Sequence, residues 1–329
     1  MMNKMATTSA LCLAMAGTSS VAYAHAGEVH AGPAVTASKV PAPAVGESRR
    51  RIGVTSEQPA GSDVGAFRTR CEVSHFNSDD PIVYPRQPGK AHHHMFFGNT
   101  GTNAHSTYES LRDSGNSTCR GGIANRSAYW VPSMIDTATS APVVPDYVDV
   151  YYKSGYNGLE PSEIRPLPRG LRMVAGAAAS TAAQENAFWG CRDQYVGQLD
   201  SIPIGVCSPG DAVLLTVKFP QCWDGVNLDS ANHKSHLSTT VAGDCPSTHP
   251  VALPEITFNV SFPVPADGDT STWRLSSDTY DETWPGGMSA HADYFEAWEA
   301  SVADAWANNC VKTGKDCHSH LLGDGRQIE

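Results

Sequence analysis

The segment from His75 to His94 concentrates side chains that bind metal ions or transfer protons. Within it lie four histidines and two adjacent aspartates, Asp79 and Asp80. Imidazole and carboxylate groups are the side chains that ligate divalent metals or exchange protons near neutral pH. So dense a cluster predicts that any chemistry of this chain is centred on this segment.

Three of these histidines are consecutive, from His92 to His94. If the backbone is extended there, His92 and His94 project to one face of the strand and His93 to the other. Two imidazoles on one strand face form a common half of a metal site. The alternative is a polar strand whose histidines bond to neighbouring backbone and hold no ion.

A third metal ligand must come from elsewhere in the chain, and His291 is the best remote candidate. The side-chain nitrogens of His92, His94 and His291 are expected within roughly 4–5 Å of one another, because each must lie near 2.1 Å from one zinc-like ion. Asp80 or Asp293 would then supply a fourth ligand or a general base. Asp293 has a second interpretation, as a carboxylate that complements the start of a helix.

His75 and Asp80 are further candidates for a catalytic role. Adjacent carboxylates such as Asp79 and Asp80 repel each other, so one of them normally faces a cation, a hydrogen-bond donor or water. The competing interpretation is a tight turn, because Asn, Ser and Asp before Pro bond to their own backbone. Without a metal, Asp80 and Asp229 could act as two carboxylates across a glycosidic bond.

A second polar stretch, residues 219–236, has a composition suited to sugar recognition. Trp223 lies beside Asp224 and Asn227, so an apolar stacking face adjoins hydrogen-bonding groups. The same residues would also suit a turn at Asp224 and a core position for Trp223. Asn99, which ends the motif that begins at His92, is assigned to substrate binding as well.

The first 24 residues have the pattern of a secretory signal peptide, with Lys4, a modestly apolar run and Ala22-Tyr23-Ala24 as a small-x-small cleavage site. Residues 25–62 are rich in Ala, Pro, Val, Gly and Ser without apolar periodicity, which predicts a flexible leader. No later stretch approaches the length of a membrane-spanning segment. We therefore expect a secreted or periplasmic protein.

Cysteine usage agrees with export. Without Cys12, eight cysteines remain and none forms a C-x-x-C pair, which favours up to four disulfides over a thiolate zinc site. Eight cysteines allow many pairings, and the sequence does not choose among them. The pairs with the shortest loops are Cys191–Cys207, Cys222–Cys245 and Cys310–Cys317, which would leave Cys71–Cys119.

The formal net charge is −11, with no basic stripe. This argues against partners such as nucleic acid or an anionic membrane and fits a neutral glycan or a cation. No Gly-x-Ser-x-Gly elbow, phosphate loop or dinucleotide fingerprint is present, which disfavours a serine hydrolase of familiar type, an NTPase and a nicotinamide enzyme. The oligomeric state stays open.

Short extended runs separated by Pro, Gly, Asn and Asp predict a mainly β fold. One helix is expected from Ala292 to Asn309, where Tyr294, Trp298, Val302 and Trp306 recur every four residues. Together these indicate a single antiparallel β-sandwich or jelly-roll-like domain with long loops, one C-terminal α-helix and disulfide staples. The expected strands are Phe67–Val73, Tyr129–Met134, Tyr147–Tyr152, Leu171–Ala175, Ala212–Phe219, Glu255–Phe262 and Trp273–Leu275.

Several of these segments, taken in order, resemble the DUF1996 family of secreted fungal and bacterial domains. The resemblance covers roughly residues 65–312 and places a family-like domain at 63–312, followed by a tail at 313–329. It implies a cell-wall or polysaccharide setting, since fungal members often adjoin wall-binding WSC modules. One departure is Ala91, where the family pattern has Ser. The matching stretches are Cys71–Pro88, His92–Asn99, Ser106–Leu111, Tyr129–Pro132, Leu171–Gly176, Phe219–His236, Cys245–Pro254 and His291–Trp298.

The leading hypothesis is a secreted enzyme that cleaves a polysaccharide with the help of a divalent metal, as a hydrolase or a lyase. The residue types admit zinc, copper or calcium. The competing hypotheses are a non-catalytic wall- or glycan-binding protein and an exported metal-binding protein without turnover. Metal content and polysaccharide turnover, measured with and without chelator, separate the three.

Overall fold

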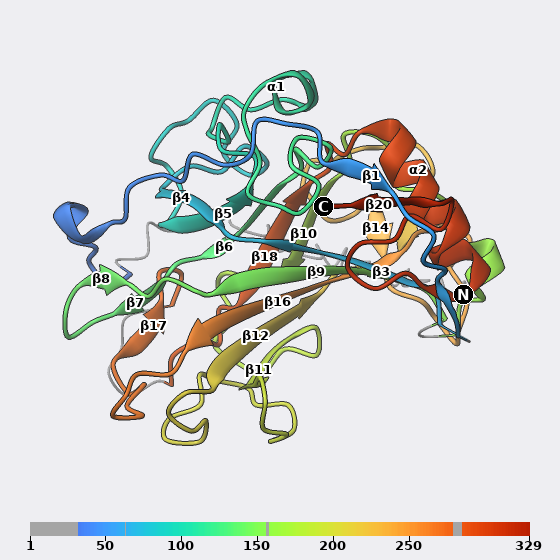
Figure 1. Ribbon diagram of the computed structural model, residues 1–329. Helices are drawn as coiled ribbons and strands as arrows, with labels where there is room; N and C mark the ends of the chain where they lie inside the picture. The colour runs from blue at the N-terminus through green and yellow to red at the C-terminus, as the bar shows by residue number, and fades with distance from the viewer. Residues whose placement is uncertain (1–31, 63, 156–157, 279–284) are drawn as a thin grey trace, which may run out of the picture.

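Two large β-sheets pack face to face and form the body of the protein (Figure 1). The computed structural model describes residues 32–329 apart from 63, 156–157 and 279–284. The five-stranded sheet has the order β10 (Arg172–Gly176), β18 (His291–Phe295), β6 (Ala128–Pro132), β5 (His94–Gly98) and β4 (Val73–Asn77). The seven-stranded sheet has the order β11 (Ala187–Cys191), β12 (Ala212–Lys218), β16 (Glu255–Pro263), β9 (Tyr147–Lys153), β3 (Ala66–Cys71), β19 (Lys315–Asp316) and β2 (Ala60–Gly61).

Aromatic side chains from the two sheets meet in the core between them. Tyr129 of β6 contacts Phe258 of β16 with ring centroids 5.6 Å apart, and Tyr294 of β18 lies 6.4 Å from Tyr152 of β9. Along β9 and β12 buried residues alternate with half-buried ones, as expected of strands with one face on a core. The predicted mainly antiparallel sandwich is confirmed.

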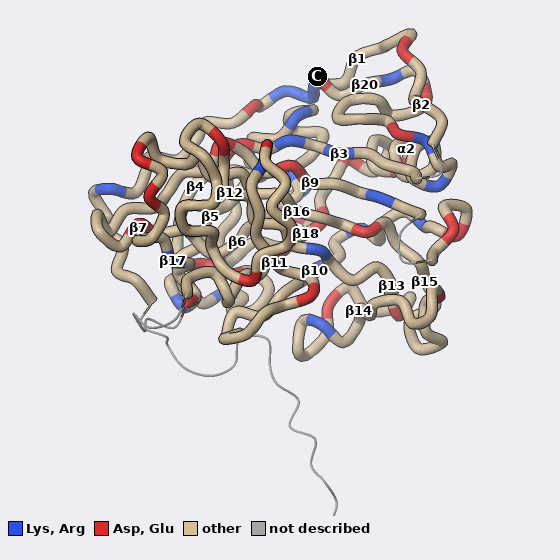
Figure 2. The backbone as a smooth tube through the Cα atoms, turned by 90° about the horizontal axis from the view of Figure 1, so that it is seen from below, with Lys and Arg blue, Asp and Glu red and all other residues tan. Residues whose placement is uncertain are grey.

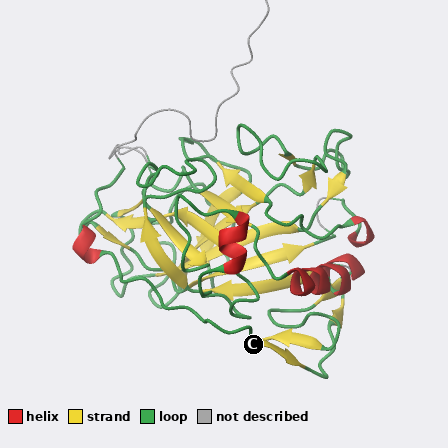
Figure 3. Cartoon of the chain, turned by 90° about the horizontal axis from the view of Figure 1, so that it is seen from above, coloured by secondary structure: helices red, strands yellow, loops and turns green. Residues whose placement is uncertain are grey.

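Small sheets and short helices surround the sandwich (Figure 3). The α-helices α2 (Ala300–Asn309) and α1 (Tyr108–Asp113) lie outside the two large sheets. Within the described part of the chain, no helix is long and apolar enough to cross a membrane. The remaining elements are β1 (Ile52–Val54) with β20 (Arg326–Ile328), β13 (Cys222–Trp223) with β14 (Leu237–Ser238) and β15 (Val251–Ala252), β7 (Met134–Asp136) with β8 (Ala141–Pro142) and β17 (Trp273–Leu275), and the 3-10 helices η1 (Ala37–Lys39), η2 (Pro161–Glu163) and η3 (Val311–Thr313).

Each predicted strand overlaps an observed one, whereas the start of the predicted helix was wrong. Residues 292–295 belong to β18, which pairs with β10 on one side and β6 on the other. A strand buried on both faces lacks apolar alternation, and Tyr294 happens to fit the helical spacing of Trp298 and Trp306. The helix itself begins at Ala300.

Four disulfides tie loops to the sheets, in the pairing with the shortest loops. They join Cys191 to Cys207, Cys222 to Cys245, Cys310 to Cys317 and Cys71 to Cys119. The Cys310–Cys317 bridge connects the end of α2 to the residue that follows β19. Disulfides of this number are typical of proteins outside the cytosol.

Residues 32–62 do not form a detached leader. The Ala44 amide donates to the Ser74 carbonyl at 2.7 Å, β1 pairs with β20, and β2 pairs with β19. Such backbone pairing needs no apolar periodicity, which is why composition predicted a flexible segment instead. The predicted signal peptide, residues 1–24, and the start of the predicted leader lie outside the described residues.

The boundary predicted at residue 312 is not a structural boundary either. The segment after it contributes β19 and β20 to two sheets, and Leu321, Leu322 and Ile328 are buried. The C-terminal residues therefore belong to the same fold as the sandwich.

Along the backbone, Lys and Arg residues are interspersed with Asp and Glu residues (Figure 2).

Candidate metal centre

The candidate residues lie on the face of the five-stranded sheet that points away from the main core, called here the outer face. Alternation along β18 places His291, Asp293 and Phe295 on one side, while Ala292 and Tyr294 belong to the core side. Cross-strand pairs extend this face over β6 and β5, because Asp293 pairs with Trp130 and Trp130 pairs with Phe96.

A second, smaller apolar cluster covers part of the outer face. Phe96, Trp130 and Phe295 of the sheet pack with Ile82 and Leu111 from segments outside it. These side chains exclude water beside the polar groups of the same face. Polar groups of the outer face are therefore buried without belonging to the sandwich core.

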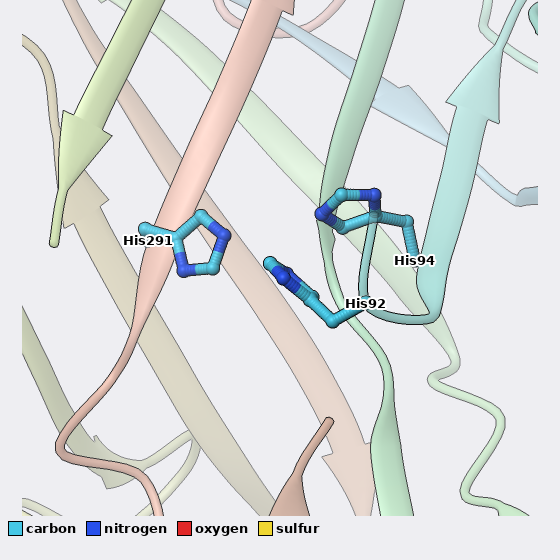
Figure 4. Close-up of side chains that lie close together, drawn as sticks. All are labelled: His92, His94 and His291. Carbon is cyan, nitrogen blue, oxygen red and sulfur yellow. The ribbon is translucent and has the colours of Figure 1, made fainter. Parts of the chain in front are cut away.

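His92, His94 and His291 converge on the outer face, and their rings point toward one another (Figure 4). One nitrogen of each ring lies within 4.8 Å of the others. His94 and His291 are fully buried, whereas His92 is half-buried. The predicted convergence of the three imidazoles is thus confirmed.

Carbonyl groups orient two of the three imidazoles. Nδ1 of His94 lies 2.9 Å from the Asp79 carbonyl oxygen, and Nδ1 of His291 lies 2.8 Å from that of Ser289. A carbonyl only accepts hydrogen bonds, so each Nδ1 carries the proton and each Nε2 carries the lone pair. This is the arrangement that fixes the tautomer of metal-binding histidines.

Burial keeps His94 in the neutral form that a metal requires. Desolvation, with a smaller contribution from His291, lowers the pKa of His94 to about 3. Its Nε2 has no hydrogen-bond partner among the described residues. A buried lone pair without a donor costs on the order of 1–3 kcal/mol, which a bound cation would offset.

Two buried carboxyl groups adjoin His94. One oxygen each of Asp80 and Asp293 lies within 4.8 Å of a His94 nitrogen and of each other. Oδ1 of Asp80 accepts the amides of Ile82 and Val83 at 2.9 and 2.8 Å. Within the described ranges, Oδ2 of Asp80 and both oxygens of Asp293 lack a hydrogen-bond partner.

The two carboxyl groups hold protons more tightly than ordinary aspartates. Burial raises the pKa of Asp80 to about 6. Burial, together with the charge of Asp80, raises the pKa of Asp293 well above its ordinary value. A divalent cation at this position would reverse the effect, because it favours both ionised forms.

The donor set fits one transition-metal ion. His94 belongs to both ligand groups, and its Nδ1 is committed to a carbonyl, so its Nε2 can serve only one ion. Two ligand atoms of a tetrahedral zinc ion lie about 3.4 Å apart. The ligand atoms here lie within 4.8 Å of one another, so they would move slightly closer together when an ion binds. Three imidazoles suit zinc or copper, whereas calcium takes six to eight oxygen ligands.

The loop from Asp229 to His236 lies over β10, next to the centre. Arg172 Nη1 donates to Asp229 at 3.2 Å, and Lys234 Nζ donates to the Gly176 carbonyl at 2.5 Å. In the sheet, Gly176 pairs with His291. The loop thus runs along the strand that borders β18, and Asp229 lies at the margin of the centre rather than inside it.

His75 and Asn99 are placed apart from the centre by their own hydrogen bonds. The two ring nitrogens of His75 contact Ser74 Oγ at 2.7 Å and the Thr102 carbonyl at 2.9 Å. Asn99 Nδ2 donates to the carbonyls of Leu111 and Ser114. Both side chains hold loops in place.

A turn closed by its own hydrogen bonds contains Trp223, Asp224 and Asn227. Trp223 Nε1 donates to the Asn227 carbonyl at 2.6 Å. Oδ1 of Asp224 accepts the amides of Val226 and Asn227, and its Oδ2 accepts the Asn227 side chain at 2.7 Å. Trp223 also packs against the core, so the structural interpretation of this motif accounts for its contacts.

Two residues near the centre, His233 and Lys234, were not selected from the sequence. Burial raises the pKa of Asp80 and of Asp293, and the charges of His233 and Lys234 respectively oppose part of this rise. Their signal in the sequence was their place in the long motif at 219–236. His93 behaves as alternation predicts, since its Nδ1 contacts Ser133 Oγ at 2.8 Å, away from the three converging rings.

A cleft of about 750 Å³ adjoins the loop over β10. Lys234 and Gly176 contribute to its wall, and Gly176 is the cross-strand partner of His291. The polar part of the lining combines hydroxyl and amide side chains with charged ones. The hydroxyl and amide groups belong to Gln184, Asn186, Ser238, Thr239 and Thr240, and the charged residues are Glu185, Lys218, Lys234 and Glu255.

The model of one family, described as Domain of unknown function (DUF1996), matches residues 80–298. This range contains the three converging histidines and both buried carboxyl groups. No curated protein and no solved structure matches the chain.

Proposed function

The chain belongs to the DUF1996 family, and we propose that it is an exported, metal-dependent enzyme that cleaves a glycan. The observation that carries this proposal is the convergence of His92, His94 and His291 within 4.8 Å beside two buried carboxyl groups. Burying four such groups, Asp80, His94, His291 and Asp293, costs free energy, and an ion offsets that cost. Hence these side chains are better suited to binding an ion than to stabilising the fold without one.

The chemistry follows from what surrounds the proposed ion. A metal held by three imidazoles lowers the pKa of a bound water or polarises a substrate oxygen or carboxylate. Asp80 and Asp293 are close enough to His94 to serve either as a further ligand or as the base that takes a proton. A bound divalent cation would favour the ionised forms of both aspartates, so either carboxylate would be available to take a proton.

The cleft beside β10, which is lined by both polar and apolar residues, supports a glycan as the substrate. Its volume of about 750 Å³ accommodates a short stretch of sugar chain. The hydroxyl and amide groups of its lining match the hydrogen-bonding pattern of sugars, and the acidic chain carries no basic stripe for a polyanion. The four disulfides support export.

A second candidate function, an exported metal-binding protein without turnover, is favoured by one observation. His94, His291 and Asp293 are fully buried. Closed sites of this kind are typical of structural metals, whereas catalytic sites keep a position open to substrate. The half-buried His92 is the ligand at which an opening toward substrate would be expected.

Metal analysis followed by turnover assays tests the proposal. We expect one zinc or copper ion per purified chain, and loss of it in His94→Ala and His291→Ala. His105→Ala is the matched control, because His105 is exposed and lies in a loop outside both ligand groups. Absence of metal from every preparation, including one refolded with zinc or copper, would sink the proposal.

A panel of neutral and acidic polysaccharides, assayed with and without chelator, separates the functions. Turnover that disappears with chelator and returns with one metal supports the enzyme. Stoichiometric metal without turnover supports the metal-binding protein. Retention on insoluble glycan with neither metal nor turnover supports a glycan-binding protein.

A further inference from the structure

Asp229 and His233 form a hydrogen-bonded pair at the edge of the candidate metal centre. Asp229 Oδ1 accepts from His233 Nδ1 at 2.9 Å. The other oxygen of Asp229 is held by Arg172 at 3.2 Å. A carboxylate that fixes Nδ1 of an imidazole leaves Nε2 as the nitrogen that exchanges protons.

The backbone of His233 is held in an uncommon conformation. Its φ angle is +58°, in the left-handed region that residues other than glycine rarely adopt. The His233 amide donates to the Ser230 carbonyl at 2.8 Å, and the amide of Ser230 donates to Asp229 at 2.8 Å. Left-handed residues of this kind cost on the order of 1–3 kcal/mol and gather at functional sites.

The loop places this pair over the row of strand residues that faces the centre. Its Asp229 end is fixed to Arg172, which pairs with Phe295, and its Lys234 end is fixed to Gly176, which pairs with His291. Asp293 lies between these two positions on β18. The loop that carries His233 therefore lies over β10, the neighbour of the strand that supplies two groups of the centre.

The ring of His233 also reaches solvent. Its side chain is 21 % exposed, and that of Asp229 is 20 % exposed, in contrast to the fully buried His94 and His291. The charged and titratable groups around the pair include Arg172 of β10, Lys234 and His236 of the same loop and, from the segment after β4, Asp80. The pair is therefore open to water, and the charge of His233 acts on Asp80 of the centre.

We infer that His233 is the proton donor of the proposed glycan-cleaving reaction and that Asp229 is its positioning residue. This inference rests on the proposed function. As the glycosidic C–O bond breaks, the leaving oxygen takes the proton of His233 Nε2. The matching proton, from the attacking water in a hydrolysis or from a sugar carbon in an elimination, goes to a carboxylate of Asp80 or Asp293, and solvent restores both groups.

The substitution His233→Asn tests the proton donor. Asn tolerates a positive φ and keeps a side-chain N–H toward Asp229, so the loop is expected to fold. We expect kcat to fall about 10²–10⁴-fold, the usual contribution of general acid catalysis. Metal content and thermal unfolding should match the wild type, and His105→Ala should leave all three quantities unchanged.

The substitution Asp229→Asn tests the positioning residue, and rescue by the conservative variant Asp229→Glu is the readout that a structural role would not give. Asp229→Asn should lower kcat with metal content unchanged, because the carboxylate no longer fixes His233 Nδ1. Asp229→Glu should restore part of kcat. A kcat within threefold of wild type in His233→Asn, or loss of metal in that variant, would overturn the inference while the metal-dependent enzyme stands. Wild-type protein that cleaves no glycan overturns both.

Discussion

His94 and Asp293 lie on strands that are not neighbours, yet their ligand atoms come within 4.8 Å of each other. β6 separates β5 from β18, and neighbouring strands are about 4.8 Å apart, so the two side chains lean together across an intervening strand. Trp130 is the residue of β6 that pairs with Asp293. The centre is therefore built by the sheet itself, with loops supplying only His92 and Asp80.

Removal of either buried imidazole is expected to abolish metal binding. His94→Ala and His291→Ala should weaken affinity by more than the roughly 10–100-fold that loss of an outer-shell partner causes. Isothermal titration with zinc at neutral pH measures this directly. His75→Asn removes an imidazole that is equally part of the histidine-rich segment but bonded to Ser74 and Thr102, and its affinity should stay at the wild-type value.

Asp293→Asn is expected to make the metal-free protein more stable and its metal binding weaker. The pKa of Asp293 is raised well above its unfolded value, so the folded state binds a proton that the unfolded state has lost. Wild-type stability therefore falls as pH rises above about 3.8, whereas Asn takes up no proton. The advantage of the variant should grow by up to about 1.4 kcal/mol per pH unit.

Urea unfolding of both proteins with chelator, from pH 4 to pH 7, measures this difference. The two curves should approach each other at pH 4 and diverge toward pH 7. A constant offset across the range would show that Asp293 is ionised in the fold. Addition of zinc at pH 7 should reverse the order of stability.

His94 should have the opposite effect on the stability of the metal-free protein. Its pKa is lowered to about 3 by burial, so below about 6.5 the unfolded state binds a proton that the folded state refuses. Stability is therefore lost as pH falls from about 6.5 toward 3, by up to about 1.4 kcal/mol per pH unit. As pH falls over this range, the unfolding free energy of the wild type should decrease relative to that of His94→Gln. Equal slopes for the two proteins would contradict burial of a neutral His94.

Much of this architecture could be predicted from sequence because single strands carry local signals. Alternation in β9 and β12 identified strands with one face on the core, and alternation from His92 to His94 placed the two outer imidazoles together. His291 was predicted as the third imidazole, although it begins a strand whose other residues had been taken for the start of a helix.

The remainder depended on tertiary contacts that leave no local signal. His75 and Asn99 have the same residue types as site residues, but their partners, Thr102 and Leu111, lie on loops whose paths the sequence does not fix. The loop that carries His233 is held by Arg172 and Gly176 of β10, which bond to Asp229 and Lys234. No periodicity within residues 219–236 could have indicated which strand that loop would cover.

Gly176 is expected to be essential to the spacing between β10 and β18. Its φ is +81°, and a Cβ there would lie 2.4 Å from the Ala290 carbonyl oxygen and 2.8 Å from the His291 Cα. Gly197 is a matched control, because its φ is +77° and a Cβ would meet nothing within 4 Å. Gly197→Ala should therefore cost only the conformational penalty of about 1–2 kcal/mol.

Gly176→Ala should cost at least about 2 kcal/mol more than the control, because backbone atoms of β18 must move to admit the methyl group. Since the displaced atoms include those of His291, zinc affinity should fall in Gly176→Ala and stay unchanged in Gly197→Ala. Urea unfolding and zinc titration of the two variants provide the measurement. Equal losses of stability in both, with zinc affinity retained, would show that the close approach of the two strands does not position His291.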